Sequence, residues 1–143
     1  MVDLMRNQDQ DDIAKERRAR VDALIGASFE VAGYAGWMAE SQRSGLKTWR
    51  KWVPEPIAQR EILVVCWRQL SASTISVSKA LERIRFEDGD LAELAGHHFD
   101  LVLELQQSAA QGDVDHIEVQ VAEIRRSADA LWAELESGRA PRR

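Results

Sequence analysis

Apolar residues recur at every third or fourth position through most of the chain, which predicts long amphipathic helices. The clearest row lies near the C-terminus and consists of Val114, Ile117, Val121, Ile124, Ala128, Leu131 and Leu135. This spacing puts all members of a row on one face, so we expect a helix over 113–137. A second row predicts a helix over 91–110, and its members are Leu91, Ala95, His98, Val102, Leu105 and Ala109.

The N-terminal half has broader patterns that predict two longer helices, over 11–43 and 55–87. The apolar row of the first helix consists of Ile13, Val21, Leu24, Ser28, Val31, Ala35 and Met38. The second helix is apolar on every side from Ile62 to Trp67, which suits either the middle of a bundle or an interface. A stretch of small and β-branched residues at 71–78 has some strand character, but the helical patterns on both sides favour a helix.

Proline and glycine indicate where these helices end. The three prolines are Pro54, Pro56 and Pro141, and long helices are possible between them. Four glycines stand where an apolar pattern stops and are predicted to end helices in the left-handed conformation: Gly45, Gly89, Gly112 and Gly138. Asp90 with Glu93 three residues later predicts a capping box, and Asp113 is expected to cap the last helix.

The fold class follows from the lengths of the connections. Short turns near 87–91 and 110–113 make neighbouring helices antiparallel. The sequence therefore predicts an all-α, up-down antiparallel bundle of about four helices. We expect a single domain over 11–137, with a flexible tail at 1–10 and a flexible basic tail at 138–143.

Three glycines inside the first predicted helix leave two alternatives open. Gly26, Gly33 and Gly36 each weaken a helix by about 0.5–1 kcal/mol relative to alanine. Either another helix, a partner subunit or a ligand packs very close to them, or the helix breaks near Gly33–Gly36.

The composition narrows the class of protein. A chain of 143 residues that is 45% hydrophobic suits one globular domain and excludes a mainly disordered chain. The longest apolar run, Ile62 to Trp67, is far shorter than the roughly 18 residues that span a bilayer, and the polar start does not resemble a secretion signal. A single cysteine, Cys66, excludes an internal disulfide and suits the cytoplasm. The net charge of -5 argues against a nucleic-acid partner.

The residues that could carry catalysis or bind metal do not form a recognisable site. Carboxylates lie near the histidines, and Glu93 with His97 and Asp113 with His116 each share a helix face. His98 is expected level with about residue 125 of the next helix, and that level is ~13 Å along the axis from His116. The two histidines are therefore too far apart to share a metal within one subunit, and a site between subunits stays open. We therefore predict no catalytic residue, metal or cofactor. We expect His98 to be a hydrogen-bonded core or interface residue and Cys66 to be a buried thiol.

The segment 43–53 is positively charged, whereas the chain as a whole is acidic. It contains four basic residues, no acidic residue and two tryptophans, and we single out Arg43, Lys47, Trp49, Arg50, Lys51 and Trp52. Tryptophan and arginine are enriched where proteins bind one another, so the segment is a candidate surface for binding a partner. The alternative is that its two rings fold back over one end of the bundle while the basic groups stay in water.

These observations predict a non-enzymatic helical protein–protein interaction module, with an adaptor, inhibitor, antitoxin-like or immunity-like role. The first two helices are longer than the last two by about ten residues, and a second copy in a homodimer would cover the apolar overhang. The alternative function is a regulatory bundle that binds a small ligand between its helices. The residues expected to line that pocket are Gly33, Trp37, Trp67, Ser71 and Thr74.

Overall fold

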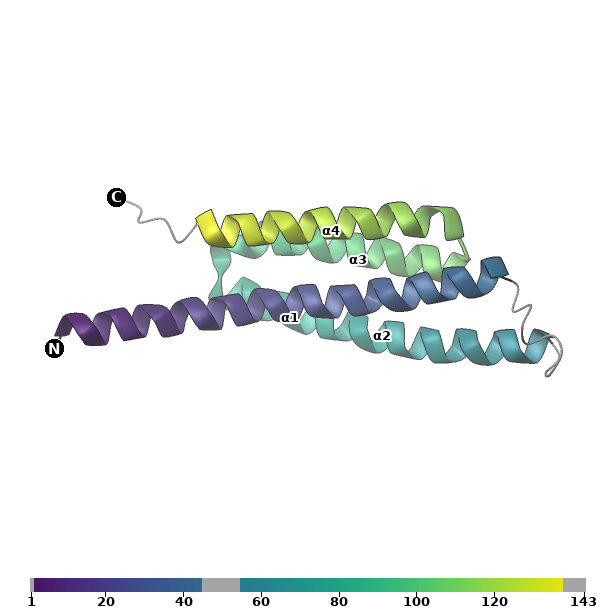
Figure 1. The fold of residues 1–143 in the computed structure, drawn as a ribbon, viewed down its shortest axis with the longest axis horizontal. Helices are drawn as coiled ribbons and strands as arrows, with labels where there is room; N and C mark the ends of the chain where they lie inside the picture. The colour runs from purple at the N-terminus through teal and green to yellow at the C-terminus, as the bar shows by residue number, and fades with distance from the viewer. Residues whose placement is uncertain (1, 45–54, 138–143) are drawn as a thin grey trace.

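The computed structural model describes residues 2–44 and 55–137, with side chains at 8–40, 61 and 63–137. The described residues form four α-helices and one short 3-10 helix, and no strand occurs among them. They are α1 (Val2–Ser44), α2 (Glu55–Glu87), η1 (Gly89–Leu91), α3 (Ala92–Gln111) and α4 (Val114–Ser137). The helices run alternately up and down and lie side by side (Figure 1). The predicted all-α, up-down antiparallel bundle is confirmed.

The long helix α1 is continuous. It passes through Gly33 and Gly36 without interruption, so the alternative of a break there is wrong. It also begins at Val2, nine residues before the start expected from the apolar row. A Cβ atom added to Gly26, Gly33 or Gly36 would meet nothing within 4 Å. No other part of the described chain therefore packs closely on these glycines.

The core is built from one apolar stripe on each helix, much as the pattern predicts. Every member of the row on α3 is buried, and His98 is among them. Two members of the row on α4, Val114 and Val121, are half-buried against the core. Ile13 of α1 departs from the prediction because it is 61% exposed. Figure 1 shows the N-terminal part of α1 extending beyond the ends of the other helices.

Helix α2 lies at an edge of the bundle. It packs against α1 and α3, and among the described residues it makes no contact with α4. The apolar stretch near its start is therefore not in the middle of the bundle. Val64, Val65 and Trp67 are exposed by 44%, 51% and 39%. Of the two placements that the sequence left open, the middle of the bundle is therefore wrong, and the interface stays a prediction.

The two short turns close in different ways. Gly112 has a φ of 70° and ends α3 in the left-handed conformation, as predicted. Gly89 has no positive φ, so the same prediction is wrong there, and this residue starts η1 instead. The predicted capping box is also wrong, because the N-cap of α3 is Leu91 and no side chain caps the helix. Asp90 pairs with Arg17 instead.

Candidate interaction surface

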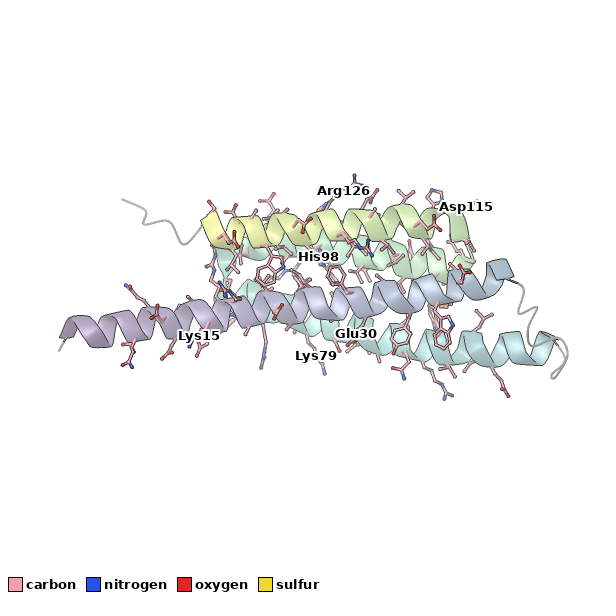
Figure 2. All side chains as sticks on the ribbon, viewed as in Figure 1. Lys15, Glu30, Lys79, His98, Asp115 and Arg126 are labelled. Carbon is pink, nitrogen blue, oxygen red and sulfur yellow. The ribbon has the colours of Figure 1, made fainter. Side chains whose placement is uncertain are left out.

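A row of exposed side chains runs along the side of α2 that faces away from the bundle. Its members alternate in steps of three and four residues and are Val64, Arg68, Ala72, Ile75, Lys79, Glu82 and Phe86. We call this set the α2 outer row. Its large apolar members, Val64, Ile75 and Phe86, are exposed by 44%, 57% and 87%. Figure 2 shows Lys79 extending from α2 away from the other helices. The spacing is that of a helix with one packed face.

The opposite side of α2 forms part of the core. Its buried residues include Cys66, Leu70, Val77, Leu81 and Ile84. The helix therefore has apolar residues on two sides, in a buried row and in the α2 outer row, which also contains Arg68, Lys79 and Glu82. Exposed apolar surface of this kind marks a site of contact with protein or ligand more often than scattered single residues do.

Ion pairs hold the C-terminal end of α2 against α1. Arg20 Nε donates to Asp88 Oδ2 at 2.7 Å, and Arg20 Nη2 donates to Asp88 Oδ1 at 2.9 Å. This hydrogen-bonded carboxylate raises the pKa of the Arg20 guanidinium further above its usual value. Arg17 makes a similar two-point contact with Asp90, at 3.0 Å from Nη1 to Oδ1. Arg17 and Arg20 of α1 are therefore both paired with carboxylates of the turn that follows α2.

Substitution of Asp88 by asparagine is expected to lower the free energy of unfolding by about 2 kcal/mol. Asp88 is 3% exposed, and its loss of charge leaves the Arg20 guanidinium half-buried without a carboxylate. Urea unfolding followed by circular dichroism measures the change. The matched control is Asp90→Asn, because Asp90 is 41% exposed and its pair is expected to contribute less than about 1 kcal/mol. Equal losses in the two variants would contradict this assignment.

A polar network in the core joins three helices through His98. The histidine is fully buried, and Figure 2 shows it inside the bundle. Its Nδ1 lies 2.9 Å from Ser127 Oγ on α4, and its Nε2 lies 2.8 Å from Ser28 Oγ on α1. Ser28 Oγ in turn donates to the carbonyl oxygen of Leu24 at 2.7 Å. His98 is thus the hydrogen-bonded core residue that the sequence predicted, two positions from the expected level on α4.

The hydrogen bonds determine the protonation of this histidine. The single hydroxyl proton of Ser28 is donated to the Leu24 carbonyl, so Ser28 Oγ must accept from His98 Nε2–H. Nδ1 then accepts from the Ser127 hydroxyl. A neutral ring satisfies every partner. Burial, with a smaller effect of His97, lowers the pKa of His98 to about 4.

The Ser28–His98 contact has the distance of a nucleophile and its general base, but its surroundings do not suit catalysis. Both side chains are fully buried, and the Ser28 proton is already donated to a carbonyl oxygen. The pair therefore acts as a connection between helices. Cys66 is buried as well, and burial raises the pKa of its thiol, which makes it less reactive.

The third histidine, His116, lies near the start of α4 and pairs with a carboxylate from the preceding turn. His116 Nδ1 lies 2.7 Å from Asp113 Oδ2, one turn apart at the start of α4. Within 2–44 and 55–137, no group of three or more histidine, cysteine, aspartate or glutamate side chains could hold a metal ion.

The sequence-predicted partner-binding residues lie outside the described part of the chain. Five of them, Lys47, Trp49, Arg50, Lys51 and Trp52, belong to 45–54, and the Arg43 side chain is also outside the described set. The segment 43–53 therefore stays a prediction.

The residues predicted to line a ligand pocket lie in different surroundings. Gly33 borders a groove of about 280 Å³ between α1 and α4, together with Phe29, Ala32, Val121 and Arg125. Trp37 and Trp67 are exposed by 50% and 39%. The Thr74 hydroxyl is buried and donates to the Leu70 carbonyl, whereas Ser71 is half-buried. The ligand-binding alternative stays a prediction.

The α2 outer row is the site that sequence reasoning missed. Its three- and four-residue spacing was present in the printed sequence, but a second apolar row on the same helix hid it. The two rows overlap near the start of the helix, where the stretch from Ile62 to Trp67 is apolar on every side. The spacing of exposed positions could have been recognised only by separating the rows.

None of the helices in the described ranges is long and apolar enough to cross a membrane. Comparison with known protein families, curated proteins and solved structures gave no match. The fold and the surface together define the class of this protein: a four-helix antiparallel bundle with an exposed apolar row along one edge helix.

Proposed function

We propose that this protein is a non-enzymatic helical interaction module that acts by binding other proteins. An adaptor, inhibitor, antitoxin-like or immunity-like role fits such a module. The observation that supports the proposal best is the α2 outer row, where Val64, Ile75 and Phe86 are all exposed. Apolar side chains aligned along a whole helix are typically covered by protein.

A homodimer is part of the proposal. The long α1–α2 pair has more apolar surface than α3 and α4 cover, and a symmetric dimer is the commonest way in which soluble proteins bury such a face. We further propose that the module works in the cytoplasm, where a chain with one buried thiol needs no disulfide.

The contact with a different protein is proposed at the basic, tryptophan-containing segment 43–53. Its composition supports this proposal, because tryptophan and arginine contribute large areas with a polar or charged edge to protein interfaces. The segment has four basic residues and no acidic one, which gives it a preference for acidic partners. The chain as a whole has a net charge of -5.

The double substitution of Trp49 and Trp52 by alanine tests this proposal. We expect the variant to lose capture of its partner in a pull-down from the native host, while its helicity and thermal midpoint stay nearly unchanged. The matched control is Trp37→Ala, which removes a half-exposed tryptophan outside the segment and is expected to leave capture intact.

Two results would count against this contact. Undiminished capture by the double variant would show that the partner binds elsewhere. A large fall in the thermal midpoint would show that the two rings fold back over one end of the bundle, which is the alternative to partner binding.

A further inference from the structure

We infer that the α2 outer row is the contact between two copies of this chain, packed antiparallel about a two-fold axis at Ile75. The inference rests on the homodimer proposed above and specifies its surface, orientation and register. An axis at this position brings together residues that lie equally far before and after Ile75 in the two chains.

The apolar members of the row are arranged symmetrically about Ile75. Val64 lies eleven positions before it and Phe86 eleven positions after it. The two-fold axis therefore places Val64 of one copy opposite Phe86 of the other, twice, with the two Ile75 side chains meeting at the centre. All three residues are exposed in the single chain, and Phe86 most of all at 87%. Burying them removes three exposed apolar side chains of α2 from water.

The charged members have the same symmetry. Arg68 lies seven positions before Ile75, and Glu82 lies seven positions after it. Antiparallel packing places Arg68 of each copy opposite Glu82 of the other, which gives two ion pairs of opposite charge. Parallel packing in register would place arginine against arginine and glutamate against glutamate. Charge complementarity therefore selects the antiparallel orientation.

The residues beside the axis are small enough for two helices to approach. Ala72 lies three positions before Ile75, and Ser78 lies three positions after it. Antiparallel packing places these two small side chains opposite each other on both sides of the axis. Lys79 faces Ser71 of the other copy, so no like charge opposes it. Small residues next to a central isoleucine allow close packing of helices.

A second copy fits this row better than an unrelated protein does. The row is complementary to itself in both apolar and charged positions, a property that a surface for an unrelated partner does not need. Within one chain, Arg68 and Glu82 are fourteen positions apart, or ~21 Å along the helix, so they cannot pair with each other. Their complementarity is satisfied only between chains.

The first experiment measures the mass of the protein in solution by light scattering over a concentration series. We expect a dimer of two 16.2 kDa chains for the unaltered protein and a monomer for Ile75→Arg, because the axis brings the two new guanidinium groups together. The matched control is Val119→Arg on α4, an equally exposed β-branched position at 55%, which is expected to remain dimeric. Circular dichroism checks that each variant keeps its helices.

The second experiment exchanges the charges. Arg68→Glu alone is expected to weaken the dimer at least tenfold, because it places two carboxylates opposite each other. Glu82→Arg alone is expected to do the same with two guanidinium groups. The double variant, Arg68→Glu with Glu82→Arg, is expected to recover the dimer. Such recovery supports the antiparallel register, because these positions cannot meet within one chain.

The results of these experiments distinguish between failure of the α2 contact and failure of the homodimer as a whole. A monomeric unaltered protein would overturn both this inference and the proposed homodimer. A dimer that survives Ile75→Arg would leave the homodimer standing and overturn the α2 surface. Failure of the double charge exchange to recover a dimer lost in both single variants would overturn the antiparallel register.

Discussion

Replacing His98 with alanine is expected to lower the free energy of unfolding by about 4 kcal/mol. Two effects add in the same direction. The side chain is fully buried, so its removal leaves a cavity among α1, α3 and α4. Its removal also takes away the acceptor of the Ser127 hydroxyl and the donor to Ser28. Urea unfolding of the variant, followed by circular dichroism, measures the loss.

The neighbouring histidine provides the control for this variant. His97 is exposed and one position away on the same helix, so His97→Ala is expected to change the free energy of unfolding by less than about 0.5 kcal/mol. Similar losses for the two histidines would mean that the buried network does not stabilise the bundle. A loss confined to His98 would support the network as a principal link among these helices.

Acidification is expected to cost the folded protein about 3 kcal/mol through His98 alone. The pKa of this residue is about 4 in the folded protein and 6.5 in its ordinary state. Between these two values the unfolded chain binds a proton that the folded chain does not bind. Stability from this residue is therefore complete above about pH 6.5 and falls as the pH drops towards 4. Below about pH 4 the folded and the unfolded chain both bind the proton, so the stability that His98 contributed does not return.

The pH dependence is measured from urea unfolding at several pH values between 7 and 4. Carboxylates also titrate near the lower end, so the informative quantity is the difference between the unaltered protein and His98→Gln. Glutamine keeps a neutral hydrogen-bonding side chain and cannot take up the proton. We expect a clearly shallower fall in stability for this variant. Equal slopes would mean that His98 does not exclude a proton in the folded state.

Much of the fold could be predicted because helical periodicity is a local property. The buried row on α4 was visible in the sequence, and so was the row on α3 that contains His98. Gly112 was predicted to end α3 and does so with a positive φ. The start of α1 was missed because its first residues carry no apolar row, and a helix can extend beyond the packed region.

The turn before α3 was harder to predict for a different reason. Asp90 and Glu93 have the spacing of a capping box, but Asp90 can satisfy its charge with an arginine from a distant helix. Arg17 and Asp90 are separated by 73 positions, and no local pattern reveals that they meet. The same holds for Arg20 and Asp88, whose pairing fixes α1 against the end of α2.

Sequence alone determined that this protein is an all-helical bundle, because apolar period, glycine position and composition are properties of the chain itself. Only the tertiary structure decided which of the two apolar rows of α2 is core. That choice depends on where α1 and α3 lie, and they bury the row that contains Leu70 and Val77 while they leave Val64, Ile75 and Phe86 exposed. Which residues are buried depends on how the helices pack. Once α1 and α3 cover one side of α2, the apolar residues on its other side stay exposed.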